Sequence, residues 1–274
     1  MNFMKVKFIA LICIVSLFCF SCTYLEDILG WLEEVDSSYF TNEEAIDAMK
    51  TALNVGAEAS SETLSATDGY YKSELQIPLP PAGEKIKTVV GTVPVVGEFV
   101  DTTLFEKVIL GINRSAEDAA KDVVPIFSEA IENMTVSDGI KIVCGEQNAA
   151  TEYLKEKTYA QLVEIYKPKI NDSLNKDLIN DISANEAWSN LTGKYNNAVN
   201  NSAVQIAAAL VGYNLSPVDE DLSQFATEKA LDGLFYMVEQ EELKIRENPS
   251  DYASDIITKV FGAVKEGFIP NYQM

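Results

Sequence analysis

Two pairs of oppositely charged residues are the side chains in this 274-residue chain best suited to bind a small ligand. Arg114 precedes Glu117 by three residues, Arg246 follows Glu242 by four, and no other arginine occurs. Residues three and four apart lie on one face of a helix, so each pair is predicted to share a face. If the two helices meet, these side chains form one polar node. Such a node either binds a carboxylate or phosphate group bidentately or joins the helices as a structural ion-pair network.

Catalytic chemistry is restricted by the absence of histidine. Without imidazole the chain has no Ser-His-Asp or Cys-His nucleophile, no HExxH zinc motif and no proton shuttle that works near neutral pH. A glycosidase-like pair of acids could be assembled from Glu117, Asp138, Glu241 or Glu242, but such a pair needs a cleft and separated pKa values. Because the chain has 42 acidic residues, some pair is inevitable. We therefore predict no catalytic residue, no metal site and no cofactor.

The N-terminus carries a pattern for export and lipid attachment. Lys5 and Lys7 precede an apolar run over residues 8–20, which is followed by Ser21 and Cys22. A positive end, an apolar core too short to span a bilayer and a small residue at the junction are typical of a secretory signal. The cysteine makes this signal resemble the lipobox of bacterial lipoproteins, in which the chain is cut before a cysteine that carries diacylglycerol. Cys22 is thus the predicted lipid attachment site; the alternative is an ordinary signal cleaved elsewhere or an uncleaved anchor.

This pattern predicts three parts in the chain. Residues 1–21 are expected to be a lipoprotein signal peptide, residues 22–40 a tether, and residues 41–274 a single helical domain. No aspartate follows Cys22 directly, so the chain lacks what resembles the inner-membrane retention signal of enteric bacteria. The predicted location is the cell envelope, at the periplasmic face or the outer surface of the outer membrane.

Overall charge limits the expected partners, and cysteine content limits the expected thiol chemistry. The chain has 42 acidic and 21 basic side chains and a formal net charge of −21, which disfavours nucleic acid and binding of anionic lipid through a basic patch. Once the signal is removed and Cys22 is modified, Cys144 is the remaining free thiol. It is predicted to form no internal disulfide and to be a buried, inert thiol rather than a reactive one.

Helical periodicity dominates the rest of the chain, and the helices that it predicts must position the charged pairs and Cys144. Three capping boxes, beginning at Thr41, Thr158 and Ser183, predict helix starts. Apolar spacing predicts further helices over residues 98–120, 123–133, 136–144, 148–155, 224–246 and 251–261. The fold class is therefore predicted to be all-α, a single-domain multi-helix bundle.

Prolines predict where this helical pattern is interrupted. Residues 75–81 and 92–97 contain prolines that favour short extended segments lying as straps across the bundle. Pro125 predicts a helix break before Ile126, and Pro168 predicts a kink or a restart. An almost wholly apolar run over residues 202–212 is too short to cross a membrane, which favours a buried hairpin over contact with a membrane or ligand.

Several short strings resemble one known family over residues 44–262. The chain is similar to the family called domain of unknown function 4197, secreted or lipid-anchored helical proteins of Gram-negative bacteria. Ser115 stands where the family pattern has alanine, and residues 202–218 look like an insertion. The resemblance implies a helical fold and an envelope location but gives no mechanism. The strings are Asp68-Gly-Tyr-Tyr71, Ile77-Pro-Leu-Pro80, Asn113-Arg-Ser-Ala-Glu117, Ala149-Ala-Thr151 with Tyr153, Leu231-Asp-Gly-Leu-Phe235, Glu241-Glu242 with Ile245-Arg246, and Val260-Phe-Gly262.

Three functions remain open from the sequence. The first is a non-enzymatic binding or scaffolding protein, attached to the membrane by its lipid, whose partner is an envelope protein or a small ligand. The second is a carboxylate-dependent hydrolase acting on envelope glycan or peptidoglycan, which requires a cleft with one acid of raised pKa. The third is a lipid carrier in which residues 202–212 help to line an apolar cavity.

Overall fold

A computed structural model describes residues 39–179 and 182–268 of the chain. The predicted signal peptide, Cys22 and nearly all of the predicted tether lie outside these residues. The described part is all-helical, with no strand and one isolated β-bridge between Ile179 and Ile182, which confirms the predicted fold class. The elements are α2 (Asn42–Leu64), α3 (Pro81–Thr92), α4 (Pro94–Gly97), α5 (Thr103–Ala120), α6 (Val123–Asn133), α7 (Gly139–Val143), α8 (Ala149–Leu174), α9 (Ala184–Val199), α10 (Ser202–Leu210), α11 (Leu222–Glu247), the 3₁₀ helix η1 (Pro249–Asp251) and α12 (Asp255–Lys265).

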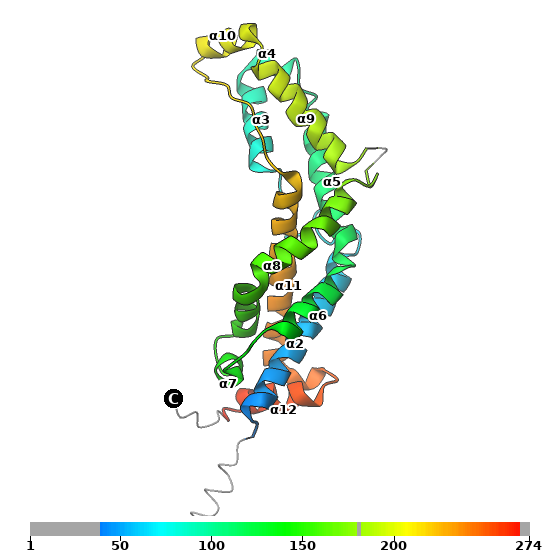
Figure 1. Cartoon of the computed structure of the whole chain (residues 1–274), viewed down its shortest axis with the longest axis vertical. Coiled ribbons are helices and arrows are strands. Elements are labelled where there is room, and N and C mark those ends of the chain that lie inside the picture. The colour runs from blue at the N-terminus through cyan, green and yellow to red at the C-terminus, as the bar shows by residue number, and fades with distance from the viewer. Residues whose placement is uncertain (1–38, 180–181, 269–274) are drawn as a thin grey trace, which may run out of the picture.

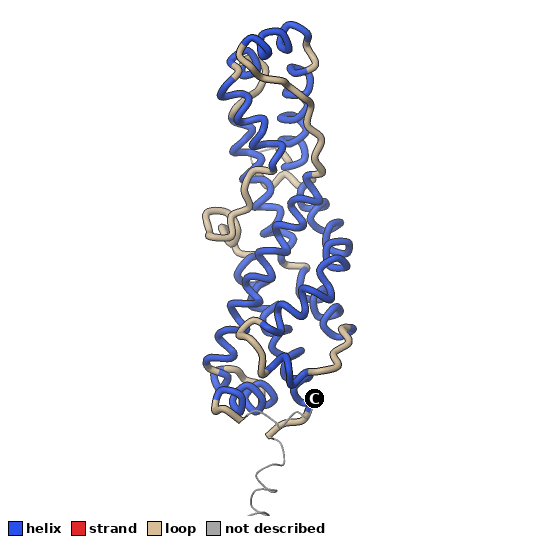
Figure 2. Tube along the Cα trace, turned by 90° about the vertical axis from the view of Figure 1, so that its left-hand side faces the viewer, coloured by secondary structure: helices blue, strands red, loops and turns tan. Residues whose placement is uncertain are grey.

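The described helices form an elongated bundle with two distinct ends (Figures 1 and 2). We call the end formed by α7, α12 and the start of α2 the N-terminal pole, and the opposite end, formed by α4 and α10, the distal pole. At the N-terminal pole the ring of Tyr39 stacks on that of Phe268, with centroids 4.0 Å apart. The first and last residues of the described chain therefore meet at the same end of the molecule.

Helix α2 packs along α11 in the lower half of the bundle, because its small and apolar residues recur at spacings of three and four. Its start is fixed by the predicted capping box, in which the Thr41 hydroxyl accepts from the Glu44 N–H and the Glu44 carboxylate accepts from the Thr41 N–H. At Gly56 the helices approach so closely that an added Cβ would lie 3.1 Å from a Val238 methyl carbon. The absence of a side chain there allows the two backbones to come together.

The extended strap predicted over residues 75–81 is present over residues 76–80, and Pro81 begins α3. Ile77 and Leu79 bury their side chains in the core. The side chain of Asn113 on α5 holds the strap, because its carbonyl accepts from the Ile77 N–H at 2.8 Å and its amide donates to the Ile77 carbonyl at 2.8 Å. A buried asparagine thus replaces the backbone partner that a sheet would supply.

Three local predictions about helix boundaries are wrong. Residues 92–97 are not a strap, since α3 continues to Thr92 and Pro94 begins α4. Helix α6 passes through Pro125 because the first turn of a helix needs no N–H donor. The third error concerns Thr158, which lies inside α8 and donates its hydroxyl to the Leu154 carbonyl instead of capping a new helix. At Pro168, α8 continues without a restart, so the kink is the alternative of the two that stays a prediction.

The apolar run over residues 202–212 is not a buried hairpin. It forms helix α10 at the distal pole, and only one side of that helix packs against the neighbouring α4 and α9. Val204 and Ala208 are buried, whereas Ile206 and Leu210 are 64% and 84% exposed. The larger apolar side chains of the run therefore face solvent rather than lining an internal cavity.

Candidate functional site

The first predicted pair lies in a cluster that joins α5 to the turn after α2. Arg114 donates to Glu117 at 2.6 Å and to Asp68 at 2.7 Å. The carboxylate of Glu117, which is 4% exposed, also accepts from the backbone N–H groups of Tyr70 and Tyr71 at 3.2 and 3.0 Å. Burial lowers the pKa of Arg114, but its hydrogen bonds to Glu117 and Asp68 outweigh that effect and raise it. The guanidinium therefore stays charged and fixes the turn.

The turn itself requires the residue types found in it. Asp68 has a φ of +64°, a left-handed conformation that a short polar side chain tolerates. A Cβ on Gly69 would lie 2.6 Å from the Leu64 carbonyl oxygen, so the chain can fold back on the end of α2 only with glycine there. The next residue, Tyr70, is fully buried and donates its hydroxyl to the Ala230 carbonyl on α11 at 2.7 Å. Burial raises the pKa of this hydroxyl well above its usual value.

The second predicted pair lies in another cluster, where α11 meets the ends of α7 and α8. Glu242, 2% exposed, accepts from the N–H groups of Ala150 and Thr151 at 3.0 and 2.8 Å, and from the Thr151 hydroxyl at 2.6 Å. A carboxylate at this place satisfies the free N–H groups and the positive end of the α8 dipole. Arg246 donates to Glu242 at 2.8 Å and to the Val143 carbonyl, at the end of α7, at 2.6 Å. This one ion pair therefore caps two helices.

The structure divides the predicted polar node into these two clusters. No hydrogen bond or ion pair among residues 39–179 and 182–268 joins Arg114 or Glu117 to Glu242 or Arg246. Tyr70 in the first cluster reaches α11 at Ala230, twelve residues before Glu242, which is about 18 Å along a helix. The two helices do not bring all four side chains to one place. The carboxylates are occupied by backbone N–H groups of the protein itself, so both clusters join segments of the bundle.

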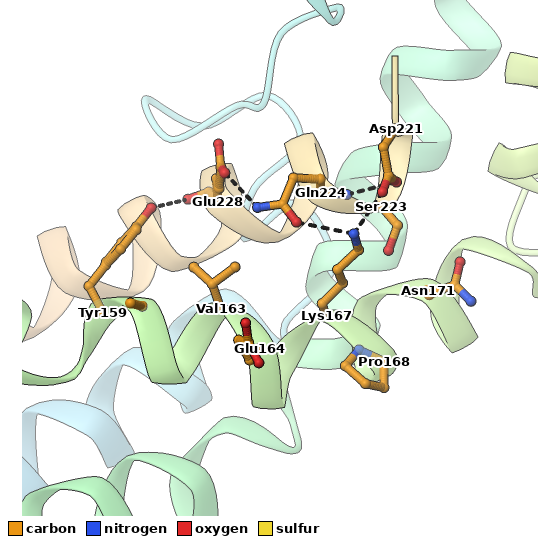
Figure 3. A pocket seen from close by; sticks show the side chains of 11 residues that line it. Tyr159, Val163, Glu164, Lys167, Pro168, Asn171, Asp221, Ser223, Gln224 and Glu228 are labelled. Atoms are coloured by element: carbon orange, nitrogen blue, oxygen red, sulfur yellow. Dashed lines mark hydrogen bonds and ion pairs between the residues drawn. The ribbon is translucent and has the colours of Figure 1, made fainter. Parts of the chain in front are cut away.

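An open groove lies between α8 and α11 (Figure 3). Its volume is about 910 Å³. Apolar and polar side chains of α8 form one wall, and the first turns of α11 form the other. The residues that line it are Tyr159, Ala160, Val163, Glu164, Lys167, Pro168, Asn171, Asp221, Ser223, Gln224 and Glu228.

Polar side chains of the groove form a chain of hydrogen bonds across it, drawn in Figure 3. Lys167 on α8 donates to the Asp221 carboxylate at 2.7 Å and to the Gln224 carbonyl at 3.1 Å. The Gln224 amide donates in turn to Glu228 at 2.6 Å. The hydrogen bond with Lys167 lowers the pKa of Asp221, and burial opposes that effect without cancelling it. The Asp221 carboxylate is therefore ionised at neutral pH.

Sequence reasoning missed this groove, although Pro168 was a signal for it. Proline has no N–H, so the carbonyl of Glu164, one turn earlier, lacks its usual helical partner. Both residues line the groove.

The remaining sequence predictions concern cysteine, metal and membrane. Cys144 is a free thiol that is partly buried against the core, and burial raises its pKa. No group of three or more Cys, Asp or Glu residues in the described ranges is arranged to hold a metal ion. Among the helices of the described residues, none is both long enough and apolar enough to cross a membrane.

The fold and the two clusters define a class of protein: an elongated all-helical bundle whose buried carboxylates fasten turns and helix ends to its long helices. A family model described as "Protein of unknown function (DUF4197)" matches residues 39–262, and the chain belongs to this family. The contacts described above are made by residues from the short strings that resemble this family, namely Asp68 to Tyr71, Asn113 to Glu117 and Thr151. Comparisons with curated proteins and with solved structures found no match.

Proposed function

We propose that this protein is a lipid-anchored component of the bacterial cell envelope, held by diacylglycerol on Cys22, with a helical body that acts as a non-enzymatic binding protein. The proposed anchor rests on the charged end, apolar run and terminal cysteine of residues 1–22. The proposed location is the outer membrane, because no aspartate follows Cys22. The binding surface is the groove between α8 and α11.

The groove favours a basic segment of an envelope protein as its occupant. Glu164, Asp221 and Glu228 face a single cation, Lys167, among the lining residues, so the groove carries an excess of negative charge. The aromatic ring of Tyr159 and the side chains of Val163 and Pro168 supply an apolar wall. The methylene stem of a lysine or arginine can lie on such a wall while its charged end meets carboxylates. This combination of an acidic rim and an apolar wall is the observation that carries the proposal.

The carboxylates of the described chain favour binding over hydrolysis. A hydrolase of the glycosidase type needs a carboxylic acid whose pKa is raised, so that it is protonated at neutral pH. Where the pKa of a carboxyl group in the described residues departs clearly from its usual value, it is lowered. The groups concerned are Glu44, Asp101, Asp118, Glu186 and Asp221.

Two experiments test the two parts of this proposal. For the anchor, a Cys22→Ala variant should lose metabolic labelling with a fatty acid and should leave the membrane fraction; unchanged labelling would refute lipidation at Cys22. For the groove, a photo-crosslinking amino acid in place of Val163 should capture an envelope protein in living cells. The same group in place of Ile165, an exposed residue of α8 outside the groove, should not.

Charge reversal distinguishes groove binding from chance capture. Glu164→Lys combined with Glu228→Lys changes the sign of the groove while leaving the buried core untouched. The cross-link from position 163 should then be lost. A cross-link of equal yield from positions 163 and 165, or one that survives charge reversal, would contradict the proposed binding surface.

A further inference from the structure

Helix α10 lies at the distal pole, at the opposite end of the bundle from α12 (Figure 1), and it exposes an apolar face there. Ile206, Leu210 and the following Val211 are 64%, 84% and 56% exposed. Val204 and Ala208 on the other side of the helix are buried, so the orientation of α10 is fixed by packing. The exposed side chains are therefore held outward at the tip of the molecule, where the cost of hydrating them is not offset within the chain.

The segment that carries this face contains no charged residue, although the protein as a whole is acidic. Residues 195–218 contain no Asp, Glu, Lys or Arg, although the whole chain has 63 such residues. The polar residues next to the apolar ones in the sequence are uncharged, namely Asn201, Ser202, Gln205 and Asn214. Because this segment has no carboxylate, it adds none of the electrostatic repulsion that the acidic parts of this chain would experience near an anionic lipid bilayer.

We propose that this distal face, formed by Ile206, Leu210 and Val211, is a lipid-binding surface that inserts into the interface of a bilayer. Aliphatic side chains on one side of a helix, with small uncharged polar residues beside them, fit the boundary between headgroups and acyl chains. A protein partner fits less well, because strong protein interfaces are centred on Trp, Tyr or Arg and bury about 800 Å² on each side. The exposed face of α10 offers three aliphatic side chains and none of these anchors.

Such a contact is weak and reversible. A single myristoyl chain binds bilayers with an association constant of about 10⁴ M⁻¹, and three short aliphatic side chains bury less hydrocarbon than that chain does. The distal face therefore acts as an auxiliary contact for a protein that is already close to a membrane. The contact should be insensitive to salt, since no charged side chain of α10 takes part.

A lipid-borne quencher can detect this contact in the full lipoprotein. The protein is reconstituted in vesicles of phosphatidylcholine that contain spin-labelled lipid, with an environment-sensitive fluorophore attached at Leu210→Cys in a Cys144→Ser background. Fluorescence at position 210 should be quenched by the spin-labelled lipid in low and high salt. The same fluorophore at Ile165→Cys, exposed in the middle part of α8, should not be quenched.

A charged variant shows whether the native face or the fluorophore makes the contact. Ile206→Asp with Val211→Asp should reduce the membrane-inserted fraction at position 210 at least about tenfold, because two apolar side chains no longer enter lipid. Circular dichroism checks that the variant remains helical. The proposal is overturned if positions 210 and 165 are quenched equally, or if quenching at 210 survives the two aspartates. It is also overturned if adding unlabelled protein abolishes the signal, which would indicate a second copy of the chain as the occupant.

Discussion

At the residue scale, Glu242 and Arg246 show how a buried ion pair contributes to this fold. The Glu242 carboxylate caps the N-terminus of α8 by accepting from its N–H groups, and the Arg246 guanidinium caps the C-terminus of α7 by donating to a carbonyl. Neither charge therefore depends on solvent for its partners. The guanidinium also lies over the ring of Phe261, 5.2 Å from its centroid. Removing one member leaves the other charge buried without compensation, which is more costly than losing a surface ion pair.

We therefore expect Glu242→Ala to lower the free energy of unfolding by about 3 to 5 kcal/mol. Urea unfolding followed by circular dichroism measures this change. Glu247→Ala is the matched control, because Glu247 is exposed at the end of the same helix, and its effect should stay within about 0.5 kcal/mol. Equal effects of the two substitutions would show that burial of Glu242 is unimportant.

A second residue-scale prediction concerns Asp118, whose pKa is lowered to about 2. Burial acts to raise this pKa, but hydrogen bonds from Lys176, Ser173 and Lys121 outweigh it. Because the folded pKa lies below the usual value of 3.8, the stabilisation is present above about pH 4 and is lost as the pH falls towards 2. After discounting for solvent screening, it amounts to about 1 to 2 kcal/mol.

Asp118→Asn isolates this contribution from those of the other acids. The difference in unfolding free energy between wild type and variant should be largest near neutral pH and should shrink as the pH falls towards 2. Urea unfolding at several pH values measures it. A difference that does not change with pH would contradict the assigned role of the Asp118 charge.

At the scale of elements, close contacts between helices and turns depend on missing side chains. Gly233 on α11 lies against the ring of Tyr70, and a Cβ there would approach a ring carbon to 2.7 Å. By contrast, Gly193 in α9 has nothing within 4 Å of the place where its Cβ would lie. The two glycines therefore occupy opposite environments in helices of the same bundle.

This contrast predicts effects of opposite sign for one substitution. Gly233→Ala should destabilise the protein by about 1 to 3 kcal/mol, because the buried Tyr70 ring must move. Gly193→Ala should stabilise it by up to about 1 kcal/mol, since alanine favours the helix and meets no obstacle. Thermal or urea unfolding of the two variants measures both changes. Stabilisation by Gly233→Ala would refute the tight contact with Tyr70.

Elements were predictable where their signals are local. The capping boxes at Thr41 and Ser183 are confirmed because the residues that satisfy them are three positions apart. The prediction of a capping box at Thr158 was wrong because α8 begins earlier in the chain, and the Thr158 hydroxyl donates to the Leu154 carbonyl, one turn before it. The exposure of α10 was missed because apolar composition gives no information about which neighbours are available to cover a helix.

Prediction of the candidate site shows the same limit. The pairs Arg114 with Glu117 and Arg246 with Glu242 follow from helical spacing, but their backbone partners come from segments far away in sequence. The groove could not be predicted, because its walls come from residues 159–171 and 221–228, and only tertiary packing brings these two stretches together.

At the scale of the whole molecule, the long axis of the bundle separates the proposed lipid-binding face from the N-terminal pole. Helix α11 alone, with 26 residues, spans about 39 Å. A compact globule of the size of residues 39–268 would have a radius of gyration of roughly 17 Å. Small-angle X-ray scattering of the monomer should give a clearly larger value, and a value near that of the globule would contradict the elongated shape.

The stacking of Tyr39 on Phe268 places both ends of the described chain side by side. A short linker could therefore join these ends, and a circular permutant opened at the exposed residues around Gly212 should retain the fold, because chain ends that lie close together permit such rearrangement. In that permutant the new termini would lie at the distal pole. A fluorescent protein fused there would report on the surroundings of α10, whereas one fused after residue 268 of the natural order would report on the opposite end.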